Sequence, residues 1–384
     1  MTLILLLILL VYVVTIVQLI AGFNRIKAYY PTKIDPKTFF AIVVPFRNES
    51  KNLPALLESI KKLNYPIDLF EIILIDDASE DDSVRQVYNW RMENGSFATT
   101  LLENVRLSNS PKKDAISRAI PIIKNEWVVT TDADCIVPEN WLMTLDHYIQ
   151  NHDVKMLVGA VTYDCNGSLL HHFQQLDLTS LQGATIGSFG MKLGFMCNGA
   201  NLCYTKSLFQ ELQGFIGNNQ MASGDDVFLL QKATHKYPEN VHYLKAKEAI
   251  VHTKPEKSWR ALFFQRIRWA SKASSYKSVF GKDLAVIVFV GNFVFVVGCM
   301  LCVLGLLTWI TLAFLFVLKF ITDYMLLHKA NRFLRKKRMH YLLLSSVLYP
   351  FFCVDWYWQM GHSNSTRHHY RFNGDFFSPF MVEN

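Results

Sequence analysis

Two aspartates separated by one residue are the first candidates for chemistry in this sequence. Asp132 and Asp134 follow residues 127–131, an apolar segment with the composition of a short buried strand. Two carboxylates at a strand end can approach one hard cation together, and Mg²⁺ or Mn²⁺ takes oxygen ligands while keeping water and substrate phosphates in its shell. Exposed turns also carry this pattern, but its position after a buried strand favours a metal site, where the cation would stabilise a departing diphosphate.

Asp76 and Asp77 form a second acidic pair, directly after the apolar residues 71–75. One of them could accept hydrogen bonds from a ribose or a base, as acidic residues do at other nucleotide sites. Helix capping is the alternative, because the residues that follow resemble the first turn of a helix. Lys112 and Lys113 could neutralise phosphate, although a lone lysine pair is usually only solvated.

Asp225 and Asp226 form a third acidic pair, preceded by Gly224 and followed by the apolar residues 227–230. A carboxylate held at a glycine turn that enters a helix could act as a general base on an acceptor hydroxyl. The alternative is an acid at a helix N-terminus that is favoured only by the helix dipole.

Gln265, Arg268 and Trp269 fall on one face of a helix, because they are three and four residues apart. The guanidinium could bind a diphosphate, and the indole could contact a sugar or a lipid-linked acceptor. An interfacial amphipathic helix with basic and aromatic residues is the alternative, and both interpretations can hold together.

Alternating strands and helices must position these residues. Residues 39–45, 71–75 and 127–131 are short apolar segments typical of buried parallel strands, and 52–63 and 83–90 have helical patterns. This alternation predicts an α/β fold with a parallel sheet and right-handed crossovers. Ligands bind beyond the carboxyl ends of such strands, where all three segments end in polar or acidic residues.

Apolar segments at both ends predict an integral membrane protein. Residues 1–24 form an uncharged segment of one bilayer span, and the bases that follow it indicate an uncleaved anchor with a cytoplasmic domain at 38–275. The apolar run 284–318 is too long for one span and predicts a transmembrane hairpin at 284–328. Within it, Lys319 and Asp323 have the spacing of an ion pair, although charges in a span are often functional.

A last apolar segment at 341–360 contains Pro350 and Asp355, so it could span, re-enter or lie in the interface, and 361–384 form a C-terminal tail.

Hydrophobic residues make up 51% of the chain, and the basic residues behind its net charge of +7 gather beside the apolar segments. That placement favours membrane anchoring and contacts with anionic lipid over nucleic-acid binding. The seven cysteines lack the spacing of a disulfide framework, as expected for a reducing compartment.

These motifs, taken together and in this order, resemble the family-2 inverting glycosyltransferases of the GT-A fold, such as cellulose and hyaluronan synthases and ceramide glucosyltransferase. The segment 45–49 resembles the PxxNE motif, 76–79 the second acidic motif, 132–134 the DxD, and 265–269 the QxxRW motif. The resemblance covers roughly residues 40–275 and implies a Rossmann-like, mostly parallel sheet flanked by helices, with N- and C-terminal transmembrane helices.

The resemblance also implies roles for individual residues. Asp226, beside Asp225, would be the catalytic base. Asp134 and Asp132 would bind Mg²⁺ or Mn²⁺. His252 could be a further metal ligand or a structural histidine. The donor nucleotide sugar would contact Pro45, Phe46, Arg47, Glu49, Asp77, Lys112, Asp132, Gln265, Arg268 and Trp269. The acceptor side would be lined by Gly199, Asn201 and Trp269. Around Lys112 the match is looser, because Pro111 replaces the usual glycine and Ile116 the usual leucine.

The expected reaction is a single displacement that inverts the anomeric carbon, with Asp226 taking the acceptor proton and Lys112 or Arg268 helping the metal to stabilise the diphosphate. We expect transfer of a hexose or N-acetylhexosamine from a nucleoside-diphosphate sugar, in particular a UDP-sugar, to a lipid or lipid-linked glycan at the inner or plasma membrane. The alternatives are a processive polysaccharide synthase, a non-catalytic membrane scaffold, and a nucleotidyl or polyprenyl-phosphate transferase. The small number of apolar segments after the domain favours single or limited transfer, and the sequence leaves the oligomeric state open.

Overall fold

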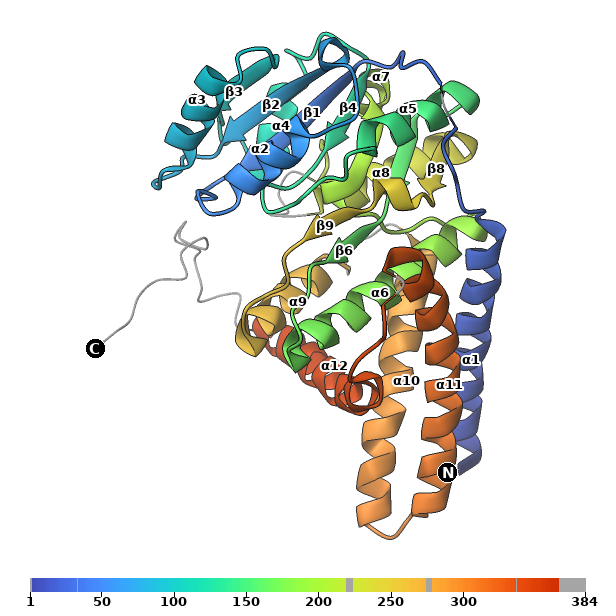
Figure 1. The fold of residues 1–384 in the computed structure, drawn as a ribbon. Helices are drawn as coiled ribbons and strands as arrows, with labels where there is room; N and C mark the ends of the chain where they lie inside the picture. The colour runs from blue at the N-terminus through green and yellow to red at the C-terminus, as the bar shows by residue number, and fades with distance from the viewer. Residues whose placement is uncertain (1, 33, 219–223, 274–277, 336, 366–384) are drawn as a thin grey trace, which may run out of the picture.

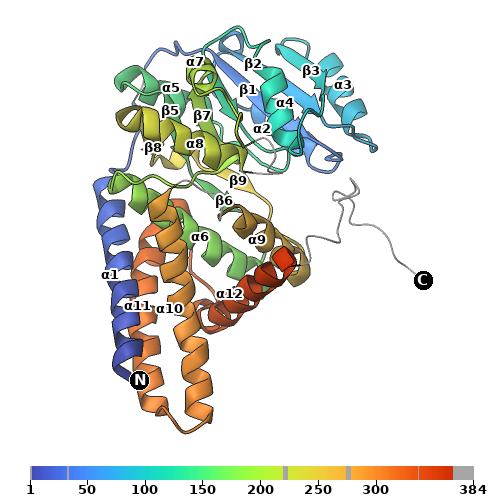
Figure 2. The same ribbon diagram turned by 180° about the vertical axis from the view of Figure 1, so that it is seen from behind.

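A computed structural model describes residues 2–32, 34–218, 224–273, 278–335 and 337–365. An α/β domain lies at one end of the molecule, and a bundle of long helices extends away from it (Figures 1 and 2). The N-terminus and the turn between α10 and α11 lie at the end of the bundle that is remote from the α/β domain.

A seven-stranded sheet in the order β3-β2-β1-β4-β7-β5-β8 forms the centre of the α/β domain. Its strands are β1 (Phe40–Phe46), β2 (Phe70–Asp76), β3 (Thr99–Glu103), β4 (Trp127–Thr130), β5 (Met156–Gly159), β7 (Leu202–Thr205) and β8 (Val241–Leu244). All neighbours pair in parallel except β7, which runs antiparallel to both β4 and β5. The predicted α/β class is confirmed, and the three expected strands are β1, β2 and β4.

Helices cover both faces of the sheet. They are α2 (Leu53–Lys61), α3 (Ser83–Glu93), α4 (Pro111–Ala119), α5 (Trp141–Asn151), α7 (Lys206–Glu211) and α8 (Asp225–Lys236). Successive residues of β1 point to opposite faces, so Ile42 packs in the core with Leu56 of α2 while Val43 packs in the core with Ile116 of α4. Because both faces are buried, the strand is a continuous apolar run rather than an alternating one.

Four short 3₁₀ helices complete the domain: η1 (Ile67–Leu69), η2 (Gly199–Asn201), η3 (Pro238–Asn240) and η4 (Lys247–Ala249). A second, two-stranded sheet pairs β6 (Val161–Tyr163) in parallel with β9 (Val251–Thr253). It lies between the main sheet and α6 (Leu169–Gly190), and α9 (Trp259–Ala273) lies beside it (Figure 1). The sequence patterns did not identify these strands, because they are only three residues long.

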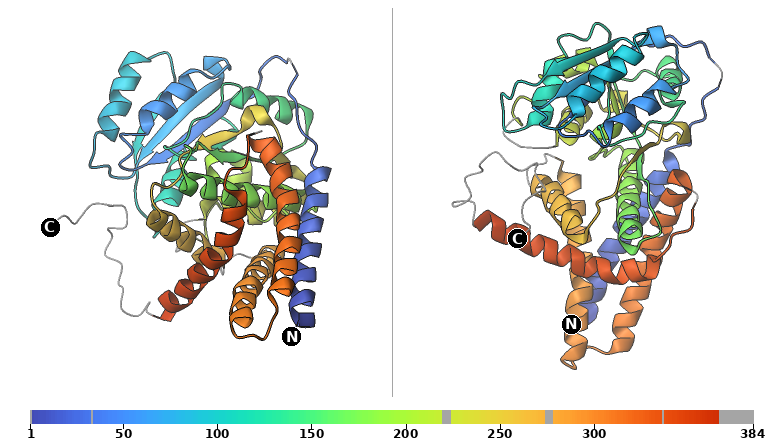
Figure 3. Two further views of the ribbon diagram at one scale, coloured as in Figure 1. Left: turned by 60° about the horizontal axis from the view of Figure 1, so that its bottom comes forward. Right: turned by 60° about the vertical axis from the view of Figure 1, so that its left-hand side comes forward.

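In the part of the chain that the structure describes, three helices are long and apolar enough to cross a membrane: α1 (Thr2–Arg25), α10 (Val279–Val303) and α11 (Trp309–Leu334). The last two are the arms of the predicted hairpin. A further helix, α12 (Leu342–Ser365), contains Pro350 and runs across the bundle rather than along it (Figure 3). That orientation favours the interfacial alternative for the predicted segment 341–360.

A polar contact joins α1 to α11 inside the bundle. Lys319 Nζ lies 2.6 Å from Asp323 Oδ2, as the spacing of the two residues predicted. The hydroxyl of Tyr12 donates to the other carboxylate oxygen of Asp323 at 2.5 Å, so the ion pair also holds α1. Buried charges need such partners in a low-dielectric environment, which explains why both charges occur within an apolar helix.

Glycines let α1 cross α6 with their backbones in contact. A Cβ atom added at Gly187 would lie 2.4 Å from the carbonyl oxygen of Leu19, and one at Gly22 would lie 2.1 Å from the carbonyl oxygen of Gly187. A Cβ at Gly190 would lie 1.9 Å from the carbonyl oxygen of Gly22. Because backbone atoms cannot move aside as a flexible side chain can, this crossing fixes α1 against α6.

We predict that Gly187→Ala lowers the thermal unfolding midpoint of the protein in mild detergent. Alanine raises intrinsic helix propensity by up to about 1 kcal/mol, whereas an added methyl group in a closed contact typically costs about 1–3 kcal/mol. Gly167→Ala is the matched control, because nothing lies within 4 Å of a Cβ added there. An unchanged or raised midpoint for Gly187→Ala would show that the helices do not meet as described.

Candidate active site

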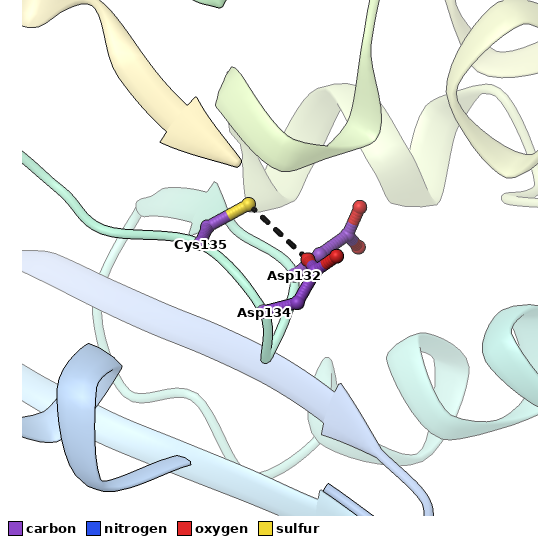
Figure 4. A group of neighbouring side chains, drawn as sticks. All are labelled: Asp132, Asp134 and Cys135. Atoms are coloured by element: carbon purple, nitrogen blue, oxygen red, sulfur yellow. Dashed lines mark hydrogen bonds between the residues drawn. The ribbon is translucent and has the colours of Figure 1, made fainter. Parts of the chain in front are cut away.

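The DxD motif lies in a turn that directly follows β4. Carboxylate oxygens of Asp132 and Asp134 and the thiol sulfur of Cys135 lie within 4.8 Å of one another (Figure 4). Burial, and then the charge of Asp132, raise the pKa of the Asp134 carboxyl, which also accepts a hydrogen bond from Thr253 Oγ1 at 3.2 Å. Two neighbouring carboxylates repel each other, and a divalent cation bound between them removes that repulsion. Asp132 and Asp134 therefore suit a divalent cation. Cys135 was not predicted from the sequence, since no spacing pattern singles it out.

Lys112, near the start of α4, compensates the acidic groups. Its Nζ atom lies 2.5 Å from Asp132 Oδ1 and 3.5 Å from Asp225 Oδ2. Burial alone would lower the pKa of this lysine, but the charges of Asp132, Asp225 and Asp226 outweigh it and raise the pKa well above its ordinary value. The lysine therefore joins the DxD motif to the acidic pair at the start of α8.

Asp225 and Asp226 are the first residues of α8, and the φ of +82° at Gly224 provides the turn into the helix. Asp226 Oδ2 accepts a hydrogen bond from the backbone N–H of Gly199 at 2.9 Å. A Cβ at Gly199 would lie 3.1 Å from Asp225 Oδ2 and 3.2 Å from Lys112 Nζ. The structure thus brings the predicted base and the predicted acceptor-side glycine into direct contact.

Asn201, the other predicted acceptor-side residue, is buried and bonded within the protein. Its amide group donates to the carbonyl oxygens of Ala160 and Ala249, both at 2.8 Å, and its side-chain oxygen accepts from Trp141 Nε1 at 3.0 Å. This arrangement supports a positioning role for Asn201, and its contact with an acceptor stays a prediction.

Asp77 lies at the end of β2 and is held by Arg106, which no sequence pattern indicated. Arg106 Nε and Nη2 donate to the two carboxylate oxygens of Asp77 at 2.9 Å and 2.8 Å, and Asn104 Nδ2 donates at 2.7 Å. The hydrogen bond with Asp77 is the main reason that the pKa of Arg106 is raised. These hydrogen bonds fix the orientation of the Asp77 carboxylate, and its contact with a ribose or base stays a prediction.

The segment that follows β1 lies between the DxD motif and the loop after β2. Pro45 and Phe46 are the last residues of β1, and the side chain of Phe46 is buried in the core on the α2 side. Arg47 Nη2 lies 3.5 Å from the carboxylate of Glu80. Burial raises the pKa of Glu49, and the charges of the nearby DxD aspartates add to the effect. Glu49 is thus the residue of this segment with a clear electrostatic link to the predicted metal site.

The QxxRW residues lie on α9, where the buried arginine is not the predicted one. Arg268 is exposed, whereas Arg266 is buried and donates through Nε to Asp177 Oδ2 of α6 at 2.6 Å. The guanidinium carbon of Arg266 lies 4.2 Å from the ring centroid of Trp269, and Gln265 Nε2 donates to Glu256 at 2.8 Å. Arg266 therefore anchors the motif to α6, a role that only the packing of the two helices could reveal.

His252 lies on β9 beside the turn that carries the DxD motif. Its Nδ1 atom is 2.8 Å from Asp164 Oδ1, while the neighbouring Thr253 contacts Asp134. The two neighbours have different partners because successive side chains of a strand point to opposite sides. Within the described parts of the chain, His252 is outside the group of possible metal ligands, and its ligand role stays a prediction.

Comparisons with known proteins agree with the fold. A family model described as glycosyl transferase family 2 matches residues 41–212, and one described as glycosyl transferase family group 2 matches residues 127–355. Among solved structures, the mannosyltransferase PcManGT from Pyrobaculum calidifontis, in complex with GDP-Man and Mn²⁺, has the same fold, with a TM-score of 0.59 at 16% identity. The alignment covers 90% of this chain and 98% of that one.

Two curated proteins match shorter parts of the chain. The glycosyltransferase GlyG of Streptococcus pneumoniae is 32% identical over 119 residues, which are 31% of this chain and 38% of GlyG. The undecaprenyl-phosphate 4-deoxy-4-formamido-L-arabinose transferase of Serratia proteamaculans is 33% identical over 107 residues, which are 27% of this chain and 31% of that protein. The chain thus matches less than two fifths of the length of either relative.

We predict that Lys112→Met lowers the thermal unfolding midpoint in metal-free buffer and increases the rise of that midpoint when Mn²⁺ is added. Without the ammonium group, the neighbouring carboxylates repel one another, and a divalent cation replaces the missing charge. Lys192→Met is the control, because Lys192 pairs with Glu239 on the exposed surface. An equal effect of Mn²⁺ on the midpoints of Lys112→Met and the unsubstituted protein would show that the lysine and the cation do not share a site.

Proposed function

We propose that this chain, which belongs to glycosyl transferase family 2, moves a sugar from a nucleoside-diphosphate donor to a lipid or lipid-linked glycan at a membrane. The observation that carries the proposal is the contact network that joins Asp226 through Gly199 and Lys112 to the DxD motif. This proximity supports Asp226 as a base that would act beside groups suited to a metal and a diphosphate. The names of the matched relatives support the reaction class, since one acts on undecaprenyl phosphate and another bound GDP-Man with Mn²⁺.

Asp132 and Asp134 would hold the cation, Mg²⁺ or Mn²⁺. When bound there, it supplies positive charge to the diphosphate of the donor. Lys112 would then exchange part of its pairing with Asp132 for the donor phosphates. Asp77, fixed by Arg106, would accept hydrogen bonds from the ribose or the base, consistent with a UDP-sugar that carries a hexose or N-acetylhexosamine.

Asp226 would act as the general base. Its Oδ2 atom is held by the Gly199 N–H, which keeps the carboxylate oriented toward the site. The proton of the acceptor hydroxyl passes to Asp226 while the hydroxyl oxygen forms a bond with the anomeric carbon. The bond from that carbon to the diphosphate oxygen breaks on the opposite side, so the anomeric configuration inverts. The nucleoside diphosphate leaves with the electron pair of the broken bond.

A lipid-linked acceptor is favoured by the position of α9. This helix carries Gln265 and Trp269, and it contacts α12, which runs across the membrane bundle. An acceptor in the membrane surface would therefore approach the site from the side on which α9 lies. We propose a cytoplasmic orientation of the domain from the basic residues that flank the spans. The alternatives that the experiment must distinguish from this proposal are a processive synthase and a non-catalytic scaffold.

We predict that Asp226→Asn lowers turnover by about 10²–10⁴-fold while nucleotide binding is kept, because the amide cannot accept the acceptor proton. The assay supplies purified protein in mild detergent with a bacterial lipid extract, Mn²⁺ or Mg²⁺ and a panel of nucleotide sugars. Its readouts are the released nucleoside diphosphate and the number of sugars on each product.

Glu239→Gln is the matched control for this prediction, because its carboxylate is exposed and pairs with Lys192 at the surface. Full turnover by Asp226→Asn would exclude the aspartate as base. Products that carry many sugars would move the assignment to a processive synthase. Folded protein that binds no nucleotide from the panel would favour the scaffold.

A further inference from the structure

Two segments that are far apart in the sequence meet beside the N-terminus of α6. The rings of His172 on α6 and His340 after α11 have their centroids 5.0 Å apart. His172 also contacts Tyr341, with ring centroids 5.6 Å apart. Arg335 and Lys337, from the connection between α11 and α12, lie close enough to Asp164 to contribute to the lowering of its pKa. The tertiary structure therefore gathers cationic groups that the sequence keeps separate.

We call this set the basic cluster. It consists of His171, His172, Arg335, Lys337 and His340. Burial lowers the pKa of His172, and the positive charges of His340, Arg335 and His171 lower it further. The first turn of the 22-residue helix α6 adds the positive end of its dipole, and Ser168 caps this helix by accepting from the N–H of His171. Arg335 and Lys337, together with the start of α6, produce a positive potential at one place.

The carboxylate beside the basic cluster is already engaged. Asp164 Oδ1 lies 2.8 Å from Nδ1 of His252, and the hydrogen bond from His252 is the main cause of the lowered pKa of Asp164. One carboxylate that has another partner cannot balance an arginine, a lysine and the end of a helix dipole. The basic cluster therefore favours an additional anion.

The basic cluster lies where a candidate membrane span ends and α12 begins. Exposed apolar side chains form a stripe along α12 at the spacing of one helical face, and 36–60% of their surface is exposed. The α12 stripe consists of Leu343, Leu344, Val347, Leu348 and Phe351. The rest of the helix packs against α10, α9 and α6, where Phe352 contacts Phe173 with ring centroids 5.3 Å apart. At the end of the stripe, Phe351 contacts Phe295 of α10 with ring centroids 6.2 Å apart. A helix with one open apolar face beside cationic groups has the composition of a membrane-surface helix.

We infer that the basic cluster and the α12 stripe together bind an anionic phospholipid, with the phosphate of its headgroup at the basic cluster and its acyl chains along the stripe. This site is separate from the one proposed for the sugar donor. A zwitterionic phospholipid would fit less well, because its own ammonium group would meet the cations of the basic cluster. The lipid would fix the height of the α/β domain above the membrane.

The test measures the thermal unfolding midpoint of delipidated protein in neutral detergent, without any sugar donor. The midpoint is followed against short-chain phosphatidylglycerol, phosphatidylcholine of the same chain length, a prenyl phosphate and inorganic phosphate. Arg335→Gln/Lys337→Gln removes two charges of the basic cluster, and Leu344→Gln/Leu348→Gln changes the α12 stripe. Arg85→Gln/Arg91→Gln on α3 is the charge-matched control, on the far side of the α/β domain (Figure 1).

We expect phosphatidylglycerol to raise the midpoint at lower concentration than phosphatidylcholine. Each cation near an anionic lipid surface contributes roughly fivefold in affinity, so Arg335→Gln/Lys337→Gln should weaken binding about 25-fold and the α3 control should not. The stripe variant should lose affinity for phosphatidylglycerol and keep its response to inorganic phosphate. Asp226→Asn should bind the lipid normally, which separates this test from that of the proposed function.

Three results would overturn the inference. The first is equal affinity for phosphatidylglycerol in Arg335→Gln/Lys337→Gln and the unsubstituted protein. The second is a response to inorganic phosphate as strong as the response to the lipid, which would make the basic cluster a simple anion site. The third is binding of the prenyl phosphate without binding of phosphatidylglycerol, which would assign the basic cluster to the acceptor.

Discussion

Carboxylates that share a buried edge repel one another, and Asp132, Asp134, Asp225 and Asp226 converge at one such edge of the sheet. The repulsion is partly compensated, because Lys112 lies within reach of both motifs that carry these aspartates, and their charges raise the pKa of its ammonium group. The position of α4, which carries the lysine, is therefore tied to those of β4 and α8. The four carboxylates outnumber the one ammonium group, so a divalent cation would add positive charge that the network lacks, and Lys112 would exchange partners when a donor diphosphate binds.

The antiparallel strand β7 has a particular consequence for this network. It enters the sheet between β4 and β5 and is preceded by η2, which presents the N–H of Gly199 to Asp226. A regular alternation of parallel strands and helices would place another crossover helix at this position. The reversed strand instead brings a backbone donor and a residue without a side chain to the acidic edge, where any larger residue would contact Lys112 or Asp225.

The candidate membrane helices α1 and α11 are connected to the domain mainly through α6. One end of α6 crosses α1 at glycines, and its middle pairs Asp177 with Arg266 of α9. Both contacts tolerate substitution poorly. The first is a crossing of two backbones, and the second is a buried ion pair in which removal of one residue would leave the charge of the other uncompensated. The QxxRW helix is consequently fixed relative to α1, so the proposed acceptor side of the site would have a defined height above a membrane that α1 crosses.

The sequence alone determined the features that depend on local signals. Hydrophobic runs with polar ends predicted β1, β2 and β4 and the acids that follow them, and long apolar segments predicted α1, α10 and α11. Ordered motifs predicted the family, because their residue types and order can be read directly along the chain.

Only the tertiary structure decided which side chains become partners. The pairing of Arg106 with Asp77, and the burial of Arg266 in place of Arg268, depend on contacts between segments that no local pattern relates. The same is true of the reversed strand β7, since a four-residue apolar segment gives no indication of its direction. Local propensity sets where strands and helices form, but the pairing of charges depends on distances that exist only after the chain has packed.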